Sequence, residues 1–164
     1  MYGYQQNLVE KTVKNLIDKE FAGQKMSLKL ANKLTERIME KAASMKMKVV
    51  VAISDEKARP VSIQCMDGSF IGSYDVALNK TFTSIAFERS TKELGKLAQP
   101  GKELYGIQFT NEGKIVIFGG GEPLFHEGKL IGALGVSGGT AEQDTKLAEY
   151  GVSILEEVIA CLRN

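Results

Sequence analysis

Hydrophobic side chains recur every three or four positions in two stretches of the N-terminal part of the chain. The first stretch ends before Gly23 and predicts an amphipathic helix over residues 4–21. The second begins after Ser27, which stands at the N-cap position of a helix, and continues to Met45. The chain is therefore predicted to open with two helices.

After residue 48 the pattern changes from helical to strand-like. Residues 49–53 form a continuous β-branched run typical of a central strand, whereas residues 61–65 alternate between apolar and polar positions. The polar connector at 54–60 joins the two as a predicted hairpin. Apolar pairs at helical spacing between Ala77 and Ala86 then predict a helix of about four turns that packs across the sheet.

The second half of the chain begins with a stretch, residues 90–106, that shows no sustained period and predicts a loop with one helical turn at 91–97. Strand-like runs follow at Lys114–Phe118, Leu124–His126 and Leu130–Val136, and Glu127–Gly128 supplies a tight turn between the last two. A T-x-x-Q capping box at Thr140 opens a long closing helix. The order ααββαβββα indicates an α+β fold with a five-stranded, mainly antiparallel sheet flanked by helices.

Composition narrows the class of protein. The 164 residues fit one domain, and 21 basic against 20 acidic side chains leave a net charge of +1. Because the basic residues are also scattered, neither nucleic acid nor a membrane is an expected partner. No apolar run is long enough to span a bilayer and no secretion signal is visible, so the expected location is cytoplasmic. Cys65 and Cys161 lie in apolar patterns and are predicted to be buried thiols.

The glycine-rich run from Phe118 to Gly139 is the most informative stretch of the chain. It does not match the Walker pattern, because glycine and serine or threonine are missing at positions that this pattern requires. It does not match the Rossmann pattern either, because no βαβ unit surrounds it. The residues Gly135–Gly139 match G-x-S-x-G by letters only, since no partner aspartate and histidine can be identified. The run is interpreted as a structural bend whose exposed amides also make it a candidate pocket wall.

Two basic side chains remain as candidates for chemistry. His126 is the only histidine and stands beside a turn, where a surface position is expected and a ligand or acid/base role is the alternative. Lys80 lies on the predicted third helix, at the edge of its apolar stripe. A solvated lysine is the favoured interpretation, and an ammonium beside a pocket is the alternative.

A series of motifs in order along the chain resembles the GlcG/HbpS family, which also includes the C-terminal domain of PduO-type proteins. These motifs are Met66-Asp67-Gly68-Ser69, Ser73, Ala77 with Lys80, Ser90-Thr91, Gly119-Gly120-Gly121-Glu122-Pro123, and Ile131 to Thr140 with Gln143-Asp144. The likeness runs from about Ser27 to Ile159. It divides the chain into an N-terminal helical extension at 1–24 and a single family domain at 25–164.

The resemblance implies a profilin-like fold, a homo-oligomer that is often an octamer, and haem or a related tetrapyrrole as cofactor. Because no histidine occurs in either N-terminal helix, the axial contact would fall to His126, Met66, a tyrosine such as Tyr74, or a threonine. The adenosyltransferase chemistry of PduO-type proteins belongs to a separate N-terminal domain, for which the residues ahead of Ser27 are too few.

Three functions follow as hypotheses. The first is a small-ligand-binding protein for a tetrapyrrole or corrinoid-related molecule, with no catalytic site that can be identified. Its pocket residues are expected to be Met66, Asp67, Lys80, Phe118, Gly119, Gly120, Gly121 and Pro123. The second is an enzyme or enzyme accessory in glycolate, diol or cobalamin metabolism, with Lys80 and Asp67 as charge or proton partners. The third is a purely structural assembly subunit.

Overall fold

The structure is a computed structural model that describes residues 23–163. The helix predicted over 4–21 lies outside these residues. Within them, a four-stranded antiparallel sheet has the order β2-β1-β4-β3. Its strands are β1 (Val50–Asp55), β2 (Pro60–Cys65), β3 (Gly121–His126) and β4 (Lys129–Ser137). The helices are α2 (Leu28–Ser44), α3 (Ser73–Phe87), α4 (Thr91–Leu97), α5 (Ala141–Ser153) and α6 (Leu155–Arg163), with 3₁₀ turns at Ile107–Phe109 and Asn111–Gly113.

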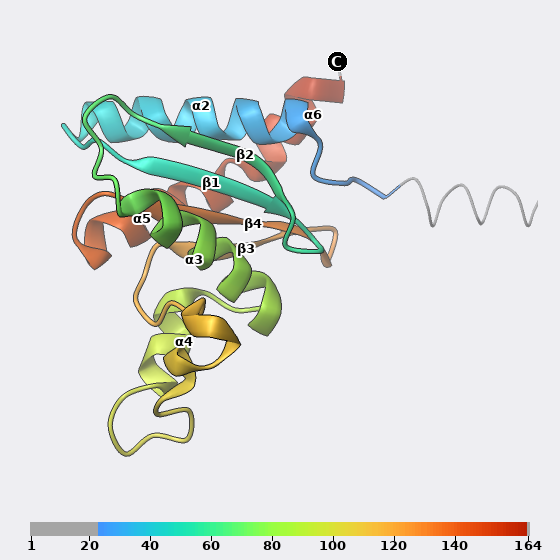
Figure 1. The fold of residues 1–164 in the computed structure, drawn as a ribbon. Helices are drawn as coiled ribbons and strands as arrows, with labels where there is room; N and C mark the ends of the chain where they lie inside the picture. Colours follow the sequence, from blue (N-terminus) through green and yellow to red (C-terminus); the bar gives the residue numbers. More distant parts are fainter. Residues whose placement is uncertain (1–22, 164) are drawn as a thin grey trace, which may run out of the picture.

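Helices cover both faces of the sheet (Figure 1). The helices α2, α5 and α6 pack on one face against Val49, Val51 and Ile53, which belong to the main apolar core. On the other face α3 covers Val50 and Ala52 through a smaller cluster. Alternate residues of β1 thus point to opposite faces, and every residue of the strand is buried. This explains the continuous apolar run that the sequence showed.

Several local predictions are confirmed. Ser27 caps α2 by accepting a hydrogen bond from the Leu30 amide, and Thr140 and Gln143 form the capping box of α5. The predicted hairpin between β1 and β2 forms, as does the helical turn at 91–97. The turn at Glu127–Gly128 places both residues at positive φ, which suits a two-residue hairpin loop between β3 and β4.

The predicted strand at Lys114–Phe118 is wrong, so the described part of the sheet has four strands and not five. Ile115 and Val116 are buried, as their apolar character requires. However, the Val116 amide donates to Thr83 Oγ1 at 2.9 Å, and the backbone of Ile117 packs against Gly95 of α4. The segment therefore satisfies its polar backbone on α3 and packs against α4, and it does not extend the sheet.

The stripe predicted for α3 is only partly correct. Ala77 and Thr81 are buried, but the rest of the buried face is polar and includes Lys80 and Ser84. Small residues are needed where the backbone of α3 lies directly on the backbone of β4. A Cβ at Gly135 would overlap the carbonyl oxygen of Ala77, which no real side chain could do. A polar face of a helix can thus pack on a sheet when its buried side chains form hydrogen bonds or ion pairs inside the protein.

Two further predictions are corrected. The closing helix is broken at Ile154 into α5 and α6. Cys65 and Cys161 are exposed, because Cys65 ends the edge strand β2 and Cys161 stands on the outer side of α6. Among the described helices, none is long and apolar enough to cross a membrane.

Candidate functional site

The predicted pocket residues do not gather in one place. Met66 and Asp67 border a hollow between the end of α2 and the end of β2. Gly119 borders a second hollow beside α5, and Pro123 a third beside α4. Lys80 is fully buried between these regions, with the half-exposed ring of Phe118 against it. The glycine bend and the Met66 region are therefore separate surfaces.

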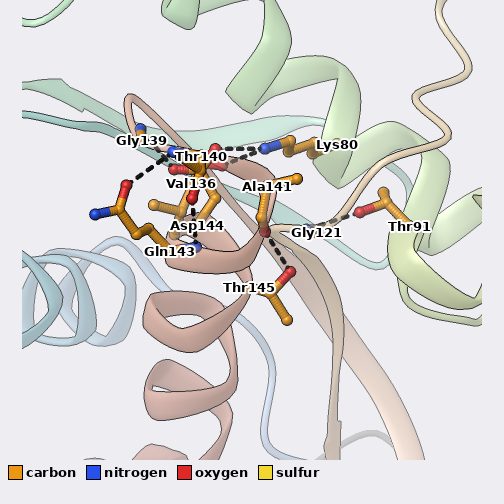
Figure 2. Close-up of polar contacts among 10 residues, drawn as sticks. All are labelled: Lys80, Thr91, Gly121, Val136, Gly139, Thr140, Ala141, Gln143, Asp144 and Thr145. Atoms are coloured by element: carbon orange, nitrogen blue, oxygen red, sulfur yellow. Dashed lines mark hydrogen bonds and ion pairs between the residues drawn. The ribbon is translucent and has the colours of Figure 1, made fainter.

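Lys80 is an interior residue and not a solvated one. Its Nζ donates to Asp144 Oδ2 at 2.9 Å and to the Val136 carbonyl at 2.7 Å (Figure 2), and it lies 5.0 Å from the centre of the Phe118 ring. Asp144 in turn accepts from the Gly139 amide at 2.9 Å. Burial lowers the pKa of the Lys80 ammonium, and the Asp144 carboxylate opposes that effect. The pair joins α3, the end of β4 and the start of α5.

The three-glycine bend is packed scaffold, as the sequence indicated. Gly120 has φ +109, a conformation that favours glycine, and its carbonyl accepts from the Val136 amide at 2.8 Å. The Gly121 amide donates to Thr91 Oγ1 at 3.0 Å (Figure 2). These contacts tie the bend to β4 and α4, so the Gly121 amide already has a hydrogen-bond acceptor within the protein. A ligand-binding role for the bend stays a prediction.

The largest of the hollows has a volume of about 610 Å³, and we call it the α2–β2 hollow. Its lining is mainly apolar, and four of the residues that border it contain sulfur. The lining residues are Met39, Ala43, Lys46, Met47, Lys48, Cys65, Met66 and Asp67. Met39 and Met66 also pack against the main core, to which the buried Met47 belongs, so the floor of this hollow is continuous with the core.

Two lysines stand at the α2–β2 hollow. Lys46 follows the end of α2 in a left-handed conformation, and Lys48 leads toward β1. The side chain of Lys48 lies across Gly68, its Nζ 2.8 Å from where a Cβ would be. Both lysines are exposed, and neither forms an ion pair with another described residue. The hollow therefore combines an apolar floor with available positive charge.

His126 is buried, which overturns its expected surface position. It ends β3 and is 6% exposed, and its Nδ1 lies 2.8 Å from the Glu156 carboxylate of α6. The tight turn that follows directs β3 against α6, so the ring is covered although the turn itself is exposed. Since β3 and β2 are opposite edges of the sheet, His126 is remote from the α2–β2 hollow.

The hollow beside α4 has a different character. It has a volume of about 390 Å³, and Glu122, Glu93 and Glu149 line it together with lysines and Arg89. Burial raises the pKa of Glu122 to about 7, and the neighbouring carboxylates of Glu149 and Glu93 add to the effect. No group of three or more described histidine, cysteine or acidic side chains is arranged to hold a metal ion. A surface this charged does not suit an apolar ligand.

Replacing Glu122 with glutamine should change the pH dependence of stability. In the folded protein the carboxyl keeps its proton up to about pH 7, whereas its ordinary pKa is 4.5. The wild type therefore loses stability as pH rises from 4.5 to 7. After allowance for solvent screening, Glu122→Gln should gain about 1 kcal/mol at pH 8, or about 2–4 °C in melting temperature, and little at pH 4. Thermal melts at both pH values check this, and an equal change at the two would contradict it.

Sequence reasoning missed Asp144, Met39 and Met47. The motif series contained Asp144, but nothing in the sequence identified it as the partner of a lysine 64 positions away. One signal for the methionines was present, because four of the six methionines fall between residues 39 and 66. Methionine clusters adapt to irregular binding surfaces, so this concentration could have indicated the hollow.

Comparison with known proteins shows which family this chain resembles. The model of the family described as haem degrading protein HbpS-like matches residues 26–153. An uncharacterized 15.0 kDa protein from the dhaT-dhaS intergenic region of Citrobacter freundii is 41% identical, over 81% of this chain and 94% of that protein. The corrinoid adenosyltransferase PduO of Salmonella typhimurium is 36% identical, over 76% of this chain but only 37% of PduO.

A solved structure, the crystal structure of the PduOC:haem complex, superposes on this chain with a TM-score of 0.76 at 35% sequence identity. The superposition covers 79% of this chain and 94% of PduOC. The shared part is the α+β domain described above, and the relative was crystallised with haem bound.

Proposed function

Since this chain belongs to the HbpS-like family, we propose that it binds a haem-type tetrapyrrole in the α2–β2 hollow. The family description and the haem complex of the PduOC relative support the class of ligand. Of the three hollows described above, the α2–β2 hollow has the lining that suits such a ligand.

The main support for this site is the combination of sulfur atoms, apolar surface and lysine side chains in the hollow. Its volume lies within the range of cofactor sites. The porphyrin ring needs an apolar surface, which the methionines and Ala43 supply. Haem iron accepts thioether ligands, and the ring's carboxylates can pair with Lys46 and Lys48. The residues present therefore fit the group, which when bound would supply iron redox or ligand-binding chemistry.

Removing the lysine charges should weaken haemin binding. Exposed ion pairs contribute about 0.2–1 kcal/mol, so Lys46→Gln and Lys48→Gln are each expected to raise the Kd by up to about fivefold. Lys57→Gln, in the turn between β1 and β2, is the matched control and should leave the Kd unchanged. Titration with haemin followed by Soret absorbance measures the effect.

Haemin dimethyl ester provides the second arm of that experiment, because it lacks the carboxylates. The wild type and the two lysine variants should bind the ester equally. If the lysine variants lose the same affinity for haemin and for its ester, the carboxylates are not at these lysines. If haemin does not saturate the wild type at all, the tetrapyrrole proposal fails.

The alternative of an enzyme or enzyme accessory loses its expected pair, because Lys80 is buried on Asp144 whereas Asp67 is exposed at the α2–β2 hollow. A structural assembly subunit is the outcome that remains if no ligand binds. Self-association is itself a proposal, supported by the exposed Phe70 and Ile71 before α3. Light scattering that reports a monomer at micromolar concentration would exclude it. A cytoplasmic location stays a prediction.

A further inference from the structure

Successive residues at the end of β2 point to opposite faces of the sheet, and this places Cys65 and Met66 on different sides. Cys65 pairs with Val50, and directly paired residues direct their side chains to the same face of a sheet. Val50 lies in the small cluster under α3, so the Cys65 thiol belongs to the α3 side. The next residue, Met66, donates its amide to the Val49 carbonyl at 3.0 Å and packs with the main core on the α2 side.

Met66 therefore shares its face with the other methionines of the hollow. Met39, on α2, and the buried Met47 belong to or pack against the same core. Met66 is half-buried, and its backbone is held at the end of the ladder between β1 and β2. Met66 thus borders the hollow from a fixed backbone position, and a fixed position is what a metal-ligating side chain requires.

The histidine and the tyrosine that the sequence suggested as iron ligands lie outside the α2–β2 hollow. The single histidine of the chain, His126, is at the opposite edge of the sheet and occupied by Glu156. Tyr74 stands in the first turn of α3, on the other side of the sheet from α2. Apart from the exposed Asp67 carboxylate, the hollow thus offers soft sulfur donors where imidazole is the common haem ligand.

We infer that Met66 is the residue whose thioether sulfur would hold the iron of a haem bound by this chain. The inference rests on the proposed function and assigns the iron-binding residue of the same hollow. A neutral thioether favours ferrous over ferric iron, so the midpoint potential of the bound haem is raised relative to haem without that bond.

Met66→Leu tests the assignment in the whole chain, with haemin as the probe. Leucine keeps the volume of methionine, so the fold should be preserved. Absorption spectra of the ferric and dithionite-reduced complexes are recorded together with a redox titration. An iron–thioether bond in the wild type should be visible in the absorption spectra, most clearly after reduction, and in the midpoint potential. Met66→Leu should change the spectrum of the reduced complex and shift the midpoint potential downward, while Cys65→Ser and Met26→Leu should leave both unchanged.

An unchanged spectrum and potential in Met66→Leu would overturn the assignment. So would the same spectral change and downward shift in Met39→Leu, Met47→Leu or Cys65→Ser with Met66 intact. If the wild type binds haemin and Met66→Leu leaves its spectra and potential unchanged, the proposed function stands and this inference fails. If the wild type binds no haemin, the proposed function fails first.

Discussion

Replacing Lys80 with methionine is expected to destabilise the folded protein by about 3–5 kcal/mol. The side chain is fully buried and donates to Asp144 and to the Val136 carbonyl. Methionine would fill much of the space but leave a buried carboxylate without its cation. The effect should be among the largest of any single substitution because three elements meet at this pair.

Urea unfolding of Lys80→Met measures the change. The double variant Lys80→Met with Asp144→Asn should recover much of the loss, since asparagine can still accept from the Gly139 amide and carries no charge. Lys92→Met is the control, because the Lys92–Glu149 pair is exposed and should contribute at most about 1 kcal/mol. A loss in Lys80→Met no greater than that in Lys92→Met would contradict the account of the buried pair.

Replacing Ala43 with tryptophan is expected to weaken haemin binding strongly while leaving the fold intact. Ala43 is exposed on the last turn of α2 and borders the α2–β2 hollow, so the indole can occupy the hollow without entering the core. Filling a site of this kind should raise the Kd by about tenfold or more, because it removes over 1.4 kcal/mol of binding free energy. Ala160→Trp, on an exposed position of α6, is the matched control.

The parts of the fold that local chemistry determines could be predicted from the sequence. The N-cap at Ser27, the capping box at Thr140 and the turn at Glu127–Gly128 each depend on neighbouring residues. The segment 114–118 could not be assigned correctly, because burial alone does not distinguish a strand from a loop that bonds to a helix. Its partner Thr83 is more than 30 residues away.

The candidate site was less predictable for the same physical reason. Met66 was identified through its motif, but its proximity to Met39 and Met47 depends on how α2 crosses the sheet. Lys80 was expected in water, because no pattern in sequence reveals that Asp144 compensates its burial. Contacts between distant positions, and not residue types, decided which lysines are structural and which are available to a ligand.

Haemin binding by a protein whose α2–β2 hollow is filled tests whether that hollow is a tetrapyrrole site. Haemin is titrated into the whole chain, Ala43→Trp and Ala160→Trp, and the Soret shift is followed to saturation. A shift that saturates at stoichiometric haemin is expected for the wild type and Ala160→Trp, and no saturation at that concentration for a folded Ala43→Trp. Equal saturation of all three proteins would place the ligand elsewhere and contradict the claim.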